Sequence, residues 1–71
     1  MRPVSADEFR KVCEKLGCRV TRQKGSHLVM TRADLVRPVV IPIHKGDLAP
    51  DVVSSNLRTL GLTRKDLEAL L

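Results

Sequence analysis

The sequence is poor in aromatic side chains: Phe9 is the only aromatic residue of 71, and both Trp and Tyr are absent. Many RNA-binding domains stack bases on aromatic rings. A chain with a single such ring must bind any nucleic acid through charge and shape. The hydrophobic residues, 42% of the total, are mostly aliphatic and lie along the whole chain, which predicts one folded domain over residues 1–71.

Cysteines and long apolar runs are also scarce. Cys13 and Cys18 are the only cysteines, too few for the disulfide framework of a secreted domain, and they have no metal-ligand spacing. We expect reduced thiols in the core and no metal or other cofactor. No apolar stretch approaches the roughly 20 residues of a membrane helix, and no signal-peptide pattern opens the chain. These features favour a cytoplasmic protein.

Acidic residues are missing from one quarter of the chain. The segment 15–32 has five basic residues and no acidic one, so it accounts for the net charge of +5. The basic residues are Lys15, Arg19, Arg22, Lys24 and Arg32. A local excess of this kind favours a polyanionic partner. A solvated surface that only maintains solubility is the alternative.

Capping and periodicity predict the helices. Ser5 and Glu8 have the spacing of a capping box, and apolar residues follow at helical intervals, so we expect a helix over residues 6–16 that ends at Gly17. A second helix is predicted to begin near Pro50 and end at Gly61. A weaker capping box over residues 63–66 predicts a short terminal helix.

The middle of the chain predicts three strands. Alternation indicates strands over 18–23 and 27–32, joined by a turn at 24–26, and a third over 38–43. Pro38 and Pro42 favour an edge position for the third strand. Short connections predict an antiparallel sheet with the helices on one face. The expected fold is therefore α+β with the order α-β-β-β-α, the architecture of double-stranded-RNA-binding domains.

Side-chain alternation predicts what each sheet face carries. We expect these side chains to face the helices: Cys18, Val20, Leu28, Met30, Val39, Ile41 and Ile43. If Arg32 pairs with Val39, His27 lies opposite His44 on the uncovered face.

An exposed His27 beside cationic groups suits general acid–base cleavage of RNA. His27 would take the proton of a ribose 2′-OH, while Lys24, Arg22 or a backbone N–H of Gly25 stabilises the phosphorane. The absence of carboxylates near the turn disfavours a two-metal mechanism. Simpler interpretations remain for each residue. His27 could be a polar turn residue, Gly25 a conformational requirement, Ser26 a turn hydroxyl and His44 the end of a strand.

The string Lys24-Gly25-Ser26-His27, between Gly17 and the segment Val40-Ile-Pro-Ile-His44, resembles the HicA toxins of bacterial HicAB toxin–antitoxin modules. The resemblance continues to Gly61-Leu62-Thr63 and so spans nearly the whole chain. It implies a double-stranded-RNA-binding-domain-like fold, metal-independent cleavage of mRNA and arrest of translation. It also implies a HicB antitoxin that covers the active-site face in a hetero-oligomer. The segment Leu28-Val29-Met30 departs from the family in lacking an aromatic residue.

Within that resemblance, His27 matches the functional histidine of the family, and Gly25 and Ser26 match the small residues before it. The predicted catalytic residue is therefore His27. Residues predicted to bind RNA or support the transition state are Lys24, Gly25, Ser26, Arg22, Arg19, Arg32 and His44. Two other functions fit the same sequence: a non-catalytic RNA-binding module, and a protein that docks a partner by strand addition.

Overall fold

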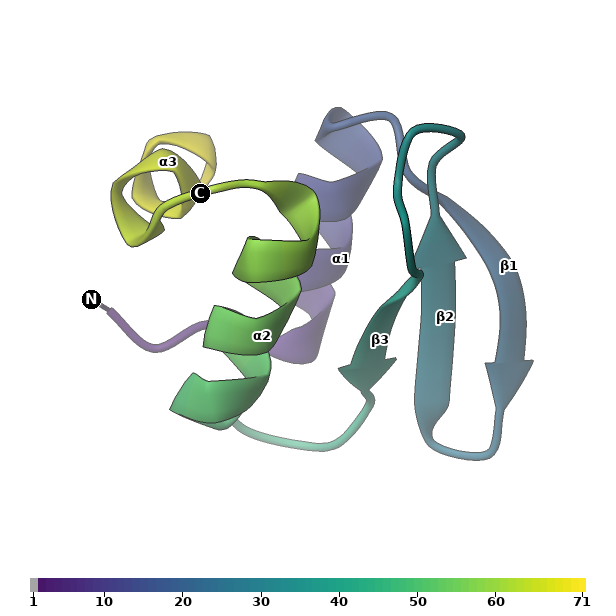
Figure 1. The fold of residues 1–71 in the computed structure, drawn as a ribbon. Helices are drawn as coiled ribbons and strands as arrows, with labels where there is room; N and C mark the ends of the chain where they lie inside the picture. The colour runs from purple at the N-terminus through teal and green to yellow at the C-terminus, as the bar shows by residue number, and fades with distance from the viewer. Residues whose placement is uncertain (1) are drawn as a thin grey trace.

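The computed structural model describes residues 2–71. Its elements are α1 (Ala6–Lys15), β1 (Arg19–Lys24), β2 (His27–Thr31), β3 (Val39–Pro42), α2 (Pro50–Leu60) and α3 (Arg64–Leu70). The strands form one antiparallel sheet in the order β1-β2-β3. The helices lie on one side of it, with α2 beside β3 and β1 farthest from α2 (Figure 1). The α+β, double-stranded-RNA-binding-domain-like fold is confirmed.

The predicted helix ends are confirmed to within a residue. Ser5 caps α1, because its side chain accepts a hydrogen bond from the Glu8 N–H while the Glu8 carboxylate accepts one from the Ser5 N–H. Thr63 and Asp66 make the same reciprocal pair at α3. Pro50 occupies the first turn of α2, and Gly61, in the left-handed conformation with φ 72°, ends it.

The core is formed by one face of β2 and β3 packed against α1 and α2. Phe9, Met30 and Ile41 are fully buried in it, together with a surrounding set of aliphatic side chains. Cys13 and Cys18 are buried free thiols, as predicted. Each large aliphatic side chain buried in this way stabilises the fold by about 1.5–3 kcal/mol.

Two residues predicted to be buried are instead exposed. All six residues of β1 are exposed, and Val20 is 47% exposed, because this strand extends beyond the area that the helices cover. Ile43 is 40% exposed because β3 ends at Pro42 and the chain leaves the sheet there. The sheet therefore has a well-buried half, β2 and β3, and a solvated edge strand, β1.

A hydrogen bond joins α2 to the outer edge of β3. The side-chain amide of Asn56 donates to the carbonyl of Val40 at 2.9 Å. This bond satisfies a carbonyl that no further strand pairs with, and it holds α2 alongside β3. Asn56 lies on the buried face of α2 between Val53 and Leu57.

Candidate nucleic-acid interface

A two-residue turn places Lys24 directly opposite His27. These two residues are paired across the β1–β2 hairpin, with Gly25 and Ser26 between them. Gly25 has φ 57°, and within residues 2–71 only glycines have a positive φ, a combination that suits a type II′ turn. The carbonyl of Ser26 accepts a 2.6 Å hydrogen bond from the N–H of Ile43, which fastens the turn to the end of β3.

A β-bulge at Thr21 determines which face the basic side chains of β1 share. Val20 pairs with Met30, but Arg22 pairs with Val29, so Thr21 is an extra residue in the strand. Such a bulge shifts the alternation of side chains by one position. Because of the shift, Arg22 lies across from Val29, and Lys24 across from His27, on the face away from the core.

The turn borders an open groove of about 570 Å³ on this face. We call it the turn groove; it is lined by Arg22, Lys24, Gly25, Ser26, His27, Val29 and Val40. Five of the eight residues predicted for the site therefore meet around one depression. His27 is exposed there, next to two cationic side chains and the backbone of a glycine turn.

Basic side chains on the two sides of the molecule differ in their partners. Those of α1 all bond acidic side chains or a backbone carbonyl, and the Arg10 hydrogen bond lowers the pKa of Asp7. By contrast, the basic side chains of β1 make no side-chain hydrogen bond or ion pair with any of residues 2–71. The cations bonded on α1 are Arg10, Lys11 and Lys15, and the unoccupied ones on β1 are Arg19, Arg22 and Lys24. Of these two elements, β1 is therefore the one whose charge is available to an anion.

Arg19 and Arg32 lie at the far end of the sheet from the turn. Arg19 pairs with Thr31, at the opposite end of β1 from Lys24. The guanidinium of Arg32 donates to the Leu16 carbonyl at 2.6 Å and makes a two-point ion pair with Asp34, at 2.6 and 3.2 Å. Arg32 therefore joins the end of α1 to the β2–β3 loop.

The predicted pairing of the two histidines is wrong. His27 pairs with Pro42, and Met30 pairs with Val39, so the register differs by two residues from the expected one. A two-residue change keeps each side chain on its predicted face but moves its partner along the strand. His44 lies two residues beyond Pro42, where its Nδ1 is 3.0 Å from the carbonyl oxygen of Lys45.

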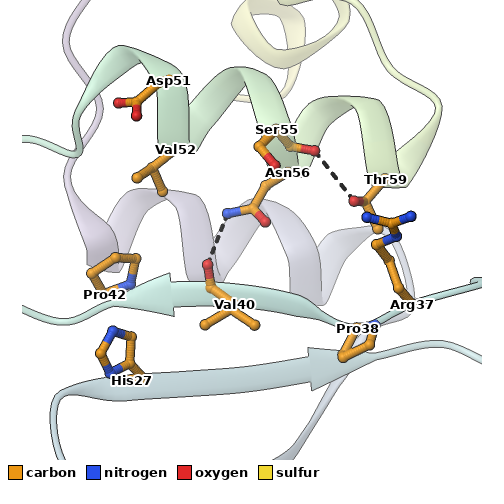
Figure 2. A pocket seen from close by; sticks show the side chains of 10 residues that line it. All are labelled: His27, Arg37, Pro38, Val40, Pro42, Asp51, Val52, Ser55, Asn56 and Thr59. Carbon is orange, nitrogen blue, oxygen red and sulfur yellow. Dashed lines mark hydrogen bonds between the residues drawn. The ribbon is translucent and has the colours of Figure 1, made fainter.

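A second groove of about 440 Å³ runs between β3 and α2 and also reaches His27 (Figure 2). We call it the helix groove; its lining is His27, Arg37, Pro38, Val40, Pro42, Asp51, Val52, Ser55, Asn56 and Thr59. It shares His27 and Val40 with the turn groove. Sequence reasoning missed this groove. One signal was present: Asn56, an amide, lies within the apolar stripe of the second helix.

Residues 2–71 contain no group of three or more His, Cys, Asp or Glu side chains placed to hold a metal ion. Within the same residues, no helix is both long and apolar enough to cross a membrane.

The structure is a small α+β domain with a double-stranded-RNA-binding-domain-like fold, and its uncovered face carries an exposed histidine beside Lys24 and Arg22. A family model described as HicA toxin of bacterial toxin–antitoxin matches residues 6–62. The chain therefore belongs to the HicA toxin family and is a toxin of a toxin–antitoxin system, which implies an antitoxin partner. No curated protein was found to be similar to it.

Proposed function

We propose that this toxin is an endoribonuclease that cleaves mRNA without a metal ion and so inhibits translation, with His27 as the acid–base residue. The observation that carries the proposal is the turn groove, where an exposed imidazole faces the free side chains of Lys24 and Arg22. Imidazole exchanges protons near neutral pH, and the two cations attract the negatively charged phosphodiester and can stabilise the further charge that develops in the reaction. Family membership supports the same function.

In the proposed reaction, His27 removes the proton of a ribose 2′-OH, and the 2′-oxygen forms a bond to the adjacent phosphorus. The bond from phosphorus to the 5′-oxygen breaks, and the leaving oxygen takes a proton from water. The products are a 2′,3′-cyclic phosphate and a free 5′-OH. Lys24, Arg22 and the backbone N–H groups of the turn would stabilise the negative charge of the phosphorane.

Lys24 and Arg22 are better candidates than the other predicted residues for this support. Both line the groove that contains His27. Arg32 already has hydrogen-bond partners at the other end of β2, and Arg19 lies at that same end. His44 follows β3 and does not pair with His27. The groove is lined by cationic, hydroxyl and apolar side chains rather than carboxylates, which favours acid–base over metal-assisted chemistry.

The open face is also the proposed docking surface of a HicB-like antitoxin. Its free cations complement an acidic partner, and a protein that covers His27 would prevent access of RNA. This arrangement would give a hetero-oligomer in the cytoplasm, where mRNA is translated.

The test is cleavage of RNA by the wild-type protein and by His27→Ala, each with EDTA present. We expect the substitution to reduce the rate by roughly 10²–10⁴-fold, the usual contribution of general acid–base catalysis. The wild-type products should carry 2′,3′-cyclic phosphate ends. Equal cleavage by both proteins, or loss of wild-type activity in EDTA, would contradict the mechanism. Equal RNA binding with no cleavage by either would indicate a passive RNA-binding module.

A further inference from the structure

We infer that the helix groove binds the RNA strand on one side of the cleaved bond, with Arg37 and Arg58 holding its phosphates. The inference rests on the proposed function. Neither arginine belongs to the basic segment of the sequence, and both follow it in the chain. They would form a second phosphate-binding position, separated from Lys24 and Arg22 by His27.

The shape of the groove suits an extended chain. One wall is β3 and its preceding residue, Pro38 to Pro42, which spans about 13 Å at ~3.3 Å per residue. The other wall is α2 from Asp51 to Thr59, about 12 Å at ~1.5 Å per residue. His27 and Pro42 lie at one end and Arg37 at the other (Figure 2). A strand with its reacting phosphate at His27 could therefore continue along the groove.

A further hollow adjoins the helix groove at Arg37. This hollow, of about 410 Å³, is lined by Arg37 and Arg58, together with Ser55, Thr59 and Val36. Arg37 and Arg58 are exposed, and no side-chain hydrogen bond or ion pair in residues 2–71 engages either of them. With the turn groove, the three hollows form one path that leads from the open face over the edge of β3 to α2. His27 lies where the turn groove and the helix groove meet, and cationic side chains lie at both ends of the path.

The helix groove also has apolar and hydroxyl side chains that suit the sugars and bases of a polynucleotide. Val40, Pro38 and Pro42 make the β3 wall apolar, which suits sugars and base faces, and Ser55 and Thr59 on the α2 wall offer hydroxyl groups. Asp51, at the start of α2, is its only acidic residue and lies near the His27 end. A polyanion in the groove would be repelled by this carboxylate.

Three variants test the inference in opposite directions. Arg37→Gln/Arg58→Gln removes the two proposed phosphate contacts. Asp51→Asn removes the repelling charge. Lys11→Gln/Lys65→Gln is the control, since it removes the same charge from α1 and α3. RNA affinity is measured in a His27→Ala background at several salt concentrations. Cleavage is measured in active protein with oligonucleotides lengthened separately on each side of the cut, and thermal unfolding verifies that each variant folds.

When the oligonucleotide is lengthened on the side of the cut that enters the helix groove, we expect kcat/KM of the wild-type protein to rise by roughly tenfold. The variant Arg37→Gln/Arg58→Gln should cleave short RNA normally but should not gain from the added length. For this arginine pair variant, the slope of the logarithm of the RNA-binding constant against the logarithm of the salt concentration should be smaller in magnitude by about 1.4, at ~0.7 per lost phosphate contact. Asp51→Asn should bind RNA more tightly. The control should match the parent protein in each assay.

Two results would overturn the inference: an arginine pair variant that behaves as the control does, or one that loses antitoxin binding while RNA binding and cleavage are unchanged. The second would make the groove a protein interface. A failure of the proposed function looks different. The wild-type protein would then cleave no RNA of any length, whereas the binding measurements on the His27→Ala background would still report on Arg37 and Arg58.

Discussion

The side-chain amide of Asn56 on α2 donates its hydrogen bond to the carbonyl of Val40, a residue that lines both grooves. Asn56 is the only polar residue buried in residues 2–71. A buried amide destabilises a fold unless it is paired, and here the pairing fixes the distance between α2 and β3. One bond therefore contributes both to stability and to the width of the helix groove.

Asn56→Ala should lower the free energy of unfolding by about 1–3 kcal/mol, because the Val40 carbonyl loses its donor and a small cavity forms. Urea denaturation measures the change. Ser55→Ala, at the neighbouring exposed position, is the control and should alter stability by less than about 0.5 kcal/mol. Similar losses of unfolding free energy in the two variants would show that the hydrogen bond of Asn56 does not stabilise the fold.

Exchange of two adjacent residues tests the face on which Lys24 lies. The double variant Gln23→Lys/Lys24→Gln keeps composition and net charge but moves the cation to Gln23, which pairs with Leu28. We expect kcat for RNA cleavage to fall by roughly a hundredfold, as when one charge-stabilising donor is lost. Unchanged kcat would mean that only the total charge of β1 matters.

Arg32→Ala should weaken the fold and leave RNA binding unchanged. Its guanidinium bonds the Leu16 carbonyl and Asp34, so its removal should cost about 1–2 kcal/mol of unfolding free energy. The salt dependence of RNA binding should stay as in the wild-type protein, whereas Arg22→Ala should reduce its slope by about 0.7 with little loss of stability. A reduced slope for Arg32→Ala would place Arg32 in the interface.

The thiol of Cys13 should make stability fall in alkaline solution. Burial, the main cause, raises the pKa of Cys13 to about 12 from an ordinary value of 9.0. The unfolded chain therefore releases this proton first as pH rises. The stabilisation that the protonated Cys13 thiol contributes to the free energy of unfolding is therefore fully present below pH 9 and is lost progressively between pH 9 and about 12.

Unfolding free energies of the wild-type protein and of Cys13→Val, which has no titrating group there, measure this effect between pH 7 and 11. The wild-type value should decrease relative to the variant only above about pH 9. A constant difference would refute the assignment. In the folded protein, neither Cys13 nor Cys18 should react rapidly with a thiol reagent at pH 8, since both are buried.

Local signals were sufficient to predict the elements of this fold. Capping boxes at Ser5 and Thr63 and the left-handed Gly61 act through hydrogen bonds between near neighbours, so the sequence alone specifies them. The faces of β2 and β3 were also predictable, because one side of each strand is apolar. The position of Val20 was not, since its exposure depends on how far the helices extend over the sheet.

Long-range geometry accounts for what sequence reasoning missed at the site. The β2–β3 register is set by a loop of seven residues with no regular turn, so a shift of two residues has no local signature. The bulge at Thr21 also has no local signature, because it follows from the pairing of Val20 with Met30 and of Arg22 with Val29, which leaves Thr21 without a partner residue. Arg37 lines the helix groove only because α2 lies beside β3. The Lys24–His27 pairing was not predicted either, because the expected turn covered residues 24–26, whereas the observed turn has only Gly25 and Ser26 between the paired residues.

β1 lies outside the core, and its six exposed residues contribute little to the packing that holds the domain together. Substitutions at Arg19, Arg22 or Lys24 should therefore be nearly neutral for folding. Folding therefore leaves the exposed positions of this strand open to substitution, apart from Arg22 and Lys24, which the proposed reaction uses. A toxin and its antitoxin could thus change specificity together through this strand, while β2, β3 and the helices preserve the same scaffold.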